Sequence, residues 1–490
     1  MHAFKLWICK LQGREICSWV FHRLWRQLVA ACHVTSFYMP LPTSDVHSRC
    51  WSSIPHDILV KVFKLLPVHE RTNLNKVCKS WSDCFSLPEL WSHLIIKIDE
   101  EIDQDGKAIS CIDQFWFAIR DVEIHVNYLQ QTSHDRAFYV MDKLASLPQR
   151  TLRKFVFRYI GFLVSAMGFA PNQQYLRRIT KLLDYEEQEM ALEVVDLNHC
   201  NVKITKKLIS LVSEQHKCLR VLCLQTTAVD SDVEPSDFLS VIQLCPYLEE
   251  LHTFYHCVDH KVIEAICVGR SQPFRFLSVA HFGISGKSSP VDTWKHLIDS
   301  QAQVEIELKF ELVLGEPGSI LEFMPVGLPL ASLHLTVSEK REFGIELRSI
   351  ASQFSATLRH VTVRCTADDV ERASDDLEAA LTCLVSNCNR LENLHCNFAL
   401  KSEVFRELRA ATSDRRCTLD ILSESETKET PELEKPKKEK KKRRWWKWRW
   451  CWKRYIWYIV LRILACFCAH MHVQYLYFSV IGRYMIIRFV

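Results

Sequence analysis

Two spacings of apolar residues divide the chain into a short helical segment and a long repetitive one. Near the N-terminus, apolar residues return every three or four positions, the period of one face of an α-helix. One such face runs from Ile54 to Leu66 and another from Leu74 to Phe85, with Pro67 between them. Proline ends a helix because it lacks a backbone donor and crowds the preceding turn. The pattern predicts a compact helical unit over residues 51–97.

This helical unit is too short to bury all of its apolar surface by itself. Three helices in about 40 residues form little core, because so short a chain buries too small a fraction of its surface. Pro55 suits the first turn of a helix, and Asp57 places a negative charge near the positive end of the helix dipole. We therefore expect a docking module whose remaining apolar face is covered by a partner.

From residue 151 to 422 the apolar residues follow a different, repeated pattern. The pattern is L-x-x-L-x-L and its variants, with most clear copies 26 to 29 residues apart. The clear copies begin at Leu192, Leu219, Leu248, Phe274, Leu330, Leu358 and Leu391, and weaker copies lie near Leu152, Ile306 and Leu419. Each copy predicts a short strand, and the period is that of the longer leucine-rich repeats.

Helical patterns separate these strands. They cover Lys206 to His216, Ser236 to Cys245, Lys261 to Gly269, Val291 to Ala302, Phe343 to Phe354 and Asp375 to Asn387. Thr205, Ser236, Asp292 and Ser374 stand near the predicted helix starts as capping residues. Strand and helix in alternation predict an α/β solenoid, in which each unit buries its apolar residues against its neighbours. A non-repetitive α/β domain with similar strands is the alternative fold.

The N-terminal unit resembles an F-box. The matching residues are Ile54-Pro55-x-Asp57-Ile58-Leu59, Phe63, Leu66-Pro67, Leu74, Val77-Cys78-Lys79-x-Trp81 and Leu90-Trp91. Two departures are mild: Ile54 stands where the family usually has Leu, and Glu70-Arg71 replaces an acidic-Leu pair. The resemblance implies binding to a Skp-type adaptor and, through it, to the cullin and RING subunits of an SCF-type ubiquitin ligase. The residues expected in or beneath that contact are Ile54, Pro55, Ile58, Leu59, Leu66, Pro67, Val77, Cys78, Trp81 and Trp91.

An F-box followed by leucine-rich repeats is also a family arrangement, in which the repeats resemble substrate-binding arms. The resemblance implies a non-catalytic subunit that recognises a protein substrate for ubiquitination and degradation. Residues between the apolar positions of each strand should face the concave surface. The substrate-binding residues proposed there are Arg220, Glu250, His252, Arg275, His334, His360 and His395. The histidines could form a pH-sensitive or metal-binding patch, but separate solvated side chains are the interpretation we favour.

Another class of function remains open beside the ligase. In it the chain is a repeat scaffold without a ligase role, and its helical unit is an N-terminal cap of the solenoid. An enzyme is disfavoured, since no nucleophile–base pair, paired carboxylates or metal-ligand spacing stands out. No cofactor is expected, because glycine is scarce at 12 residues and no phosphate-binding loop occurs. The 21 cysteines include no C-x-x-C pair, so buried reduced thiols are expected.

The two ends of the chain differ in composition from its centre. Residues 1–50 are expected to be a disordered leader, and residues 98–150 a linker with lead-in helices. Residues 423–444 form a charged linker ending in a basic run that resembles a nuclear import signal. Residues 435–454 carry a local charge of +11 against +4 overall, so the rest of the chain is near −7. We therefore expect a mildly acidic, cytoplasmic or nuclear body with a basic tail and no nucleic-acid partner.

Residues 445–490 combine tryptophans and basic residues with an apolar run, and three interpretations stay open for them. A membrane anchor needs about 20 apolar residues, and Arg462 interrupts this run. A segment lying on an anionic membrane surface tolerates Arg462 better. The third interpretation is an aberrant extension that is not native coding sequence. Membrane association through this tail is thus the alternative localisation.

Overall fold

The computed structural model describes residues in many segments between 55 and 423. They are 55–66, 68–98, 110, 113–127, 130–147, 152–160, 172–184, 192–200, 202–226, 228–268, 270, 272–281, 291–300, 303–312, 319–337, 343–365, 372–413, 415 and 417–423. The leader, the charged linker after Ser423 and the tail 445–490 lie outside these residues, as do Ile54 and Pro67.

The described chain begins with a unit of short helices. They are α3 (His56–Lys64), α4 (Val68–Arg71), η2 (Leu74–Lys76), α5 (Lys79–Phe85) and α6 (Pro88–Trp91). Pro88 opens α6 at a position where the missing backbone donor costs nothing. The predicted helical unit is confirmed, and it leads directly into the first strand.

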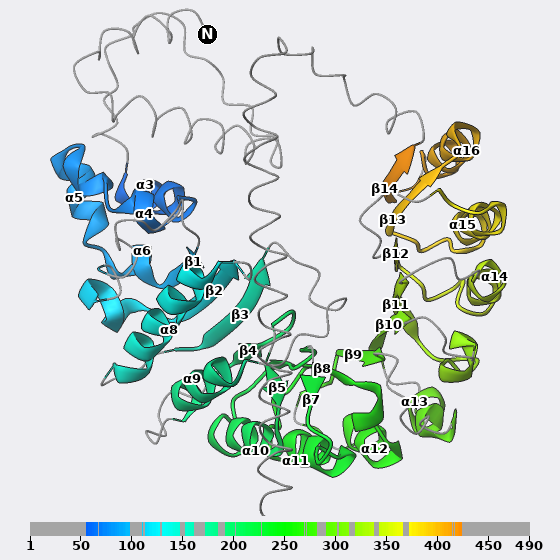
Figure 1. Cartoon of the computed structure of the whole chain (residues 1–490), viewed down its shortest axis with the longest axis horizontal. Helices are drawn as coiled ribbons and strands as arrows, with labels where there is room; N and C mark the ends of the chain where they lie inside the picture. The colour runs from blue at the N-terminus through cyan, green and yellow to red at the C-terminus, as the bar shows by residue number, and fades with distance from the viewer. Residues whose placement is uncertain are drawn as a thin grey trace, which may run out of the picture. The chain divides into compact units, whose positions relative to one another are not determined.

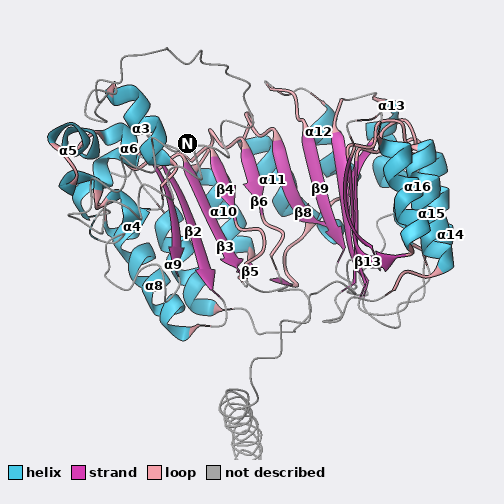
Figure 2. Ribbon diagram, turned by 90° about the horizontal axis from the view of Figure 1, so that it is seen from above, coloured by secondary structure: helices cyan, strands magenta, loops and turns pink. Residues whose placement is uncertain are grey.

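Twelve strands form one sheet whose spatial order is the order of the sequence (Figures 1 and 2). Every strand pair with a described register is parallel. The strands are β1 (His93–Ile98), β2 (Asp121–Asn127), β3 (Lys154–Ile160), β4 (Val194–Asp196), β6 (Val221–Cys223), β8 (Glu250–Phe254), β9 (Phe276–His281), β10 (Glu305–Leu312), β11 (Leu330–Val337), β12 (His360–Cys365), β13 (Asn393–Leu400) and β14 (Thr418–Ser423). Two further short strands, β5 (Lys203–Ile204) and β7 (Ala228–Val229), pair with each other.

Helices cover one face of this sheet and leave the other face to line the inside of its curve (Figure 1). They are α8 (Gln131–Ser146), α9 (Gln173–Leu183), α10 (Lys206–Gln215), α11 (Pro235–Leu244), α12 (His260–Cys267), α13 (Lys295–Asp299), α14 (Gly344–Gln353), α15 (Asp375–Asn387) and α16 (Ser402–Thr412). Single 3₁₀ turns are η3 (Trp116–Ala118), η5 (Tyr255–Cys257), η6 (Val291–Trp294) and η7 (Ile320–Phe323). The predicted solenoid of strand–helix repeats is confirmed.

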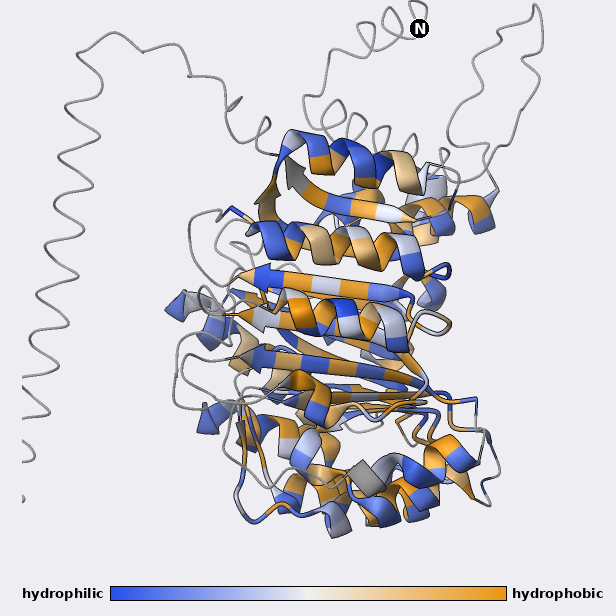
Figure 3. Cartoon of the chain, turned by 90° about the vertical axis from the view of Figure 1, so that its right-hand side faces the viewer, coloured by the Kyte–Doolittle hydropathy of each residue, from blue (hydrophilic) through white to orange (hydrophobic). Residues whose placement is uncertain are grey.

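The repeated apolar positions form the core between the strands and the helices. Every residue of the seven clear L-x-x-L-x-L copies with an apolar side chain at a repeat position is 5 % exposed or less. Apolar and polar residues alternate along the strands in Figure 3, as expected when one face of a sheet is buried and the other is not. Each strand therefore directs its repeat residues toward the helices and the residues between them toward the inner face.

The helix starts agree only in part with the predicted caps. The hydroxyls of Thr205 and Ser374 accept backbone N–H bonds and cap α10 and α15 as predicted. Ser236 is not a cap, because α11 begins one residue earlier and Glu234 and Asp237 form a reciprocal capping box around Pro235. The side chain of Asp292 lies outside the described residues.

The sheet begins earlier in the sequence than residue 151. β1 and β2 pair with each other in parallel and continue onto β3, and α8 packs beside them. Both strands alternate apolar and polar residues, although they do not keep the L-x-x-L-x-L spacing. The segment that we assigned to a linker and lead-in helices thus holds a strand and a helix of the repeat architecture.

Candidate functional site

One face of the F-box-like unit carries apolar side chains that the described residues leave exposed. Ile58 and Leu65 are 47 % and 49 % exposed, and Val62 between them is partly buried. Ile58 and Val62 lie on one face of α3, and Leu65, the C-cap residue of this helix, continues that face at the next three-residue step. Val77, which is 42 % exposed, and the partly buried Cys78 lie just before α5. We call these five residues the apolar face of the helical unit.

The opposite side of the same helices is buried. Leu59 and Phe63 turn inward from α3, and the ring centroids of Phe63 and Trp81 are 4.8 Å apart. Trp91 stacks on Phe115 at 4.5 Å, and its indole N–H donates to the Phe85 carbonyl at 2.7 Å. Because Phe115 lies beyond β1 in the sequence, the core of the helical unit continues into the sheet.

Arg71 ties three parts of this unit together. Its buried guanidinium donates to the carbonyl oxygens of Lys64 (3.0 Å), Leu66 (3.0 Å) and Leu90 (2.8 Å). A guanidinium has five donors in a rigid fork, so one side chain can satisfy several carbonyls at the helix ends. This bonding fixes α3 relative to α6, and a longer bond of 3.4 Å to the His93 carbonyl reaches the start of β1.

A polar network occupies the centre of the inner face of the sheet. Glu307 accepts hydrogen bonds from Ser278 Oγ (2.5 Å) and from the Lys309 and His334 side chains (2.8 Å each). Lys309 also donates to Gln225 Oε1 at 2.9 Å, which links strands β6, β9, β10 and β11. Burial raises the pKa of Glu307, but the bonds from His334 and Lys309 outweigh it and lower that pKa well below the usual range.

Charged residues of alternating sign stand where the strands begin. Arg220 bonds to Glu249 at 2.6 Å, and Arg275 approaches the other oxygen of Glu249 at 3.4 Å. Farther along, Arg359 bonds to Glu305 at 2.6 Å. Arg359 precedes β12 and Glu305 opens β10, so this bond passes over β11. The bond can form because β11 has the small Ala331 near its start. We call this row the charged rim of the sheet.

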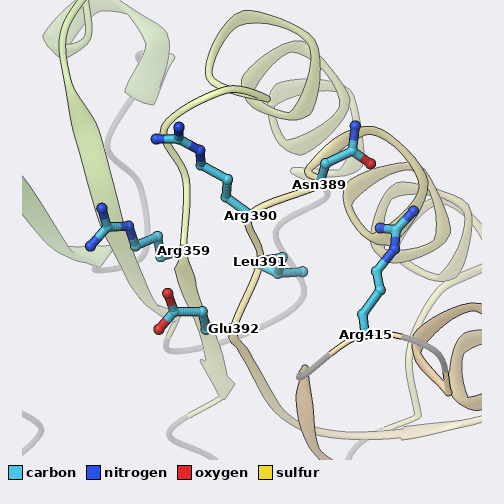
Figure 4. Close-up of a pocket in the computed structure, with 6 residues that line it drawn as sticks. All are labelled: Arg359, Asn389, Arg390, Leu391, Glu392 and Arg415. Atoms are coloured by element: carbon cyan, nitrogen blue, oxygen red, sulfur yellow. The ribbon is translucent and has the colours of Figure 1, made fainter.

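Three hollows open along the charged rim. One is lined by Glu193, Cys218, Arg220, Tyr247, Glu249, Gln272 and Arg275. The next is lined by Glu250, His252, Arg275, Phe276, Gln303 and Glu305. The third, shown in Figure 4, is lined by Arg359, Asn389, Arg390, Leu391, Glu392 and Arg415, and we call it the arginine pocket.

Comparison with known proteins agrees with this geometry. An F-box-like family model matches residues 51–97, which contain the apolar face. Human F-box/LRR-repeat protein 8 is 22 % identical over 368 residues, which cover 73 % of this chain and 91 % of that protein. The Bos taurus form is 24 % identical over the same shares. F-box/LRR-repeat protein 21 of Bos taurus is 31 % identical over 236 residues, 46 % of this chain and 51 % of that protein.

The chain has the architecture of an F-box protein with leucine-rich repeats. The F-box residues expected at the adaptor contact fall into two groups. Pro55, Ile58 and Val77 are exposed and Cys78 is partly exposed, whereas Leu59, Leu66, Trp81 and Trp91 are buried. The sequence analysis missed Val62 and Leu65 as surface residues, although their spacing from Ile58 on one helical face was a usable signal.

The proposed substrate residues of the F-box/LRR chain do not form one cluster. Arg275 lies with Glu250 and His252 in one hollow of the rim, and Arg220 lies in the next. His334, His360 and His395 lie near Glu307, Glu392 and Asp420, respectively. Burial lowers the pKa of His252 to about 4. Within the described segments no three His, Cys, Asp or Glu residues come together as metal ligands.

The alternative localisation of the F-box/LRR chain depends on residues outside the description. None of the helices between Pro55 and Ser423 that the structure describes is both long and apolar enough to cross a membrane. The tail 445–490, to which the anchor hypothesis applies, lies outside the described residues.

Proposed function

We propose that this protein is the substrate-recognition subunit of an SCF-type ubiquitin ligase. The F-box binds a Skp-type adaptor and, through it, the cullin and RING subunits, and the repeats bind a protein substrate. The subunit itself catalyses no reaction, and it acts in the cytoplasm or the nucleus. The observation that carries the proposal is the exposed apolar face of Ile58, Val62, Leu65, Val77 and Cys78 on an F-box-like domain.

An exposed apolar face of this kind favours association. Burying one large apolar side chain stabilises a complex by roughly 1.5–3 kcal/mol before the costs of association. Isolated exposed apolar residues are common on monomers, but Ile58, Val62 and Leu65 follow one helical face, and Val77 and Cys78 belong to the same small unit, which favours an interaction site. The buried residues Leu59, Trp81 and Trp91 hold the helices that present this face, so they support the contact without making it.

Exchange of exposed residues tests the adaptor contact without disturbing the F-box core. We expect Ile58→Glu combined with Leu65→Glu to abolish co-purification of the adaptor and cullin with the full chain. Ile345→Glu is the matched control, because Ile345 on α14 is 70 % exposed and lies far along the sequence in the repeats. Circular dichroism and a thermal melt establish that both variants fold. Undiminished adaptor recovery with the double variant would contradict the assignment.

A repeat scaffold without a ligase role is the second candidate. The observation that favours it is the shared core of the helical unit and the sheet, since Trp91 packs on Phe115 as a solenoid cap would. A cap covers the end of a repeat array and needs no adaptor. The same co-purification separates the two: if the helical unit is a cap, neither adaptor nor cullin is recovered with the unmodified chain.

Membrane tethering through the tail is tested by deletion of residues 437–490. If the tail tethers the chain, its deletion should release the chain into the soluble fraction.

A further inference from the structure

The arginine pocket lies at the last strands of the sheet and carries three guanidinium groups. Arg359 precedes β12, Arg390 and Glu392 lie between α15 and β13, and Arg415 precedes β14. Figure 4 shows Arg359 and Arg390 on one side of Leu391 and Arg415 on the other. The lining therefore combines three positive charges with the single carboxylate of Glu392.

The other two hollows of the charged rim lack this excess of positive charge. The hollow around Arg220 and Arg275 has two arginines and two glutamates. The hollow around His252 has one arginine and two glutamates. The arginine pocket is thus distinguished within one series of equivalent positions by its charge rather than by its shape.

Arg390 and Arg415 together supply the excess, and Arg390 supplies its share at one position of the repeat. The residue two places before the rim residue is Cys218, Tyr247, Pro273, Gln303 and Thr357 in earlier repeats and Arg390 in this one. A charged side chain at this position therefore occurs only once in the compared series. Arg390 adds its charge directly to the hollow between two strand starts.

The three guanidinium groups differ in their existing bonds. Arg359 is held by Glu305 at 2.6 Å, and Arg415 donates to the Val385 carbonyl at 2.8 Å and so caps the end of α15. Arg390 has no hydrogen-bond or ion-pair partner among the described residues. Arginine has five donors, so Arg359 and Arg415 keep unused donors while their bonds hold them in place. A free guanidinium beside two fixed ones is an arrangement that suits an oxyanion.

We propose that the arginine pocket binds an oxyanion carried by a peptide, either a phosphorylated side chain or a carboxylate. Guanidinium groups match both anions because paired N–H donors meet paired oxygens. The Glu392 side chain is 56 % exposed and lies 4.0 Å from His360. Its carboxylate is negatively charged and therefore repels an anion that enters the pocket. The choice of a peptide as the carrier rests on the proposed substrate-binding role of the repeats.

Saturation-transfer difference NMR on the full chain tests the pocket. The probes are acetylated and amidated Gly-Gly-X-Gly-Gly peptides in which X is phosphoserine, aspartate or serine. We expect the anionic probes to bind and the serine probe not to bind. Arg390→Gln should weaken the anionic probes about tenfold, the loss expected for charge-assisted hydrogen bonds. Glu392→Gln should tighten them about threefold, since it removes a nearby like charge.

Arg364→Gln is the matched control, because Arg364 is an exposed arginine of β12 outside the pocket lining. The Arg364→Gln variant should bind the anionic probes with the same affinity as the unmodified chain. Preference for the phosphoserine probe identifies a phosphate as the ligand group, and preference for the aspartate probe identifies a carboxylate. Absence of binding, or equal losses in Arg390→Gln and Arg364→Gln, overturns the proposal. So does binding of phosphatidylserine vesicles that needs Arg390 when neither anionic peptide needs it.

The test is independent of the ligase assignment. Adaptor co-purification depends on the F-box, so it should persist in Arg390→Gln. If the unmodified chain recovers the adaptor but binds neither anionic probe, the pocket alone is contradicted. If the unmodified chain binds the anionic probes but recovers no adaptor, the ligase role alone is contradicted.

Discussion

At the scale of single residues, Glu307 illustrates how the inner face combines charge with burial. The Glu307 side chain is 11 % exposed, and its carboxylate receives bonds from Ser278, Lys309 and His334. An ionised carboxylate that is bonded in the folded chain, but solvated in the unfolded chain, binds protons less readily when folded. The lowered pKa of Glu307 is therefore linked to stability.

We expect Glu307→Gln to lower the free energy of unfolding near neutral pH by roughly 1–3 kcal/mol. Because the folded pKa of Glu307 is lowered, its contribution is full above the ordinary glutamate pKa of about 4.3 and declines as the pH falls below it. The difference in free energy of unfolding between the unmodified chain and Glu307→Gln should thus be large at pH 6 and become smaller toward about pH 3.

Urea denaturation at several pH values measures this difference. Glu305→Gln on the charged rim is the control, since that side chain is 46 % exposed and its pair with Arg359 should contribute about 1 kcal/mol or less. If the difference in free energy of unfolding between the unmodified chain and Glu307→Gln increases on acidification, the link between the lowered pKa of Glu307 and stability is contradicted.

Residue-level prediction from the sequence succeeded for the core and failed for this network. The repeat spacing placed Leu222, Leu251 and Leu277 in the core, because burial follows the period directly. The network joins Gln225, Ser278 and Glu307 across three repeats. Their contact depends on the strand register and on the chain length of each repeat, which no local pattern specifies.

At the scale of elements, the close approach of α14 and α15 depends on a glycine. Gly344 is the first residue of α14, and a Cβ added there would lie 2.7 Å from the backbone oxygen of Asp376. Asp376 also bonds to Arg348 at 2.6 Å, which joins the two helices. The absence of a side chain at Gly344 thus lets the helices pack at this distance.

We expect Gly344→Ala to destabilise the chain by about 1–3 kcal/mol, the usual cost of overpacking. Alanine is the better helix former by about 1 kcal/mol, so a propensity argument alone predicts the opposite sign. Chemical denaturation distinguishes the two. Ser352→Ala, at an exposed position of the same helix, provides the comparison and should be neutral or slightly stabilising. Equal stability gains in both variants would show that α15 yields to the added methyl group.

Element-level prediction failed at the N-terminal strands for a related reason. β1 and β2 alternate apolar and polar residues, which is a strand signal, but they lack the repeat spacing that identified the later strands. A fixed repeat period therefore does not identify them. The α11 cap was missed because Glu234 with Asp237 replaces the usual Ser, Thr, Asp or Asn.

At the scale of the described molecule, the F-box and the repeats share one continuous apolar core. The cluster of buried residues runs from Leu59 in α3 to Ile421 in β14. The sequence predicted two kinds of unit, and it indicated correctly that the helical one is too small to be covered by itself. It did not indicate that β1 and Phe115 supply part of the cover, because that contact joins residues outside both patterns.

An excised F-box should therefore be poorly folded. We expect residues 51–97 alone to show no cooperative thermal transition by circular dichroism, because Trp91 loses Phe115 and the sheet beside it. The full chain under the same conditions should melt cooperatively. A sharp, cooperative transition in the excised peptide would contradict this expectation.

The agreement between strand order and chain order has a consequence for how the molecule can vary. Neighbouring strands are about 4.8 Å apart, so the gain or loss of one internal repeat changes the distance along the sheet from the F-box to the last strands by a fixed increment. The sequences of the F-box and of the last strands need not change when a repeat is gained or lost between them. Duplication of an internal repeat can thus change the distance between these two parts while preserving both.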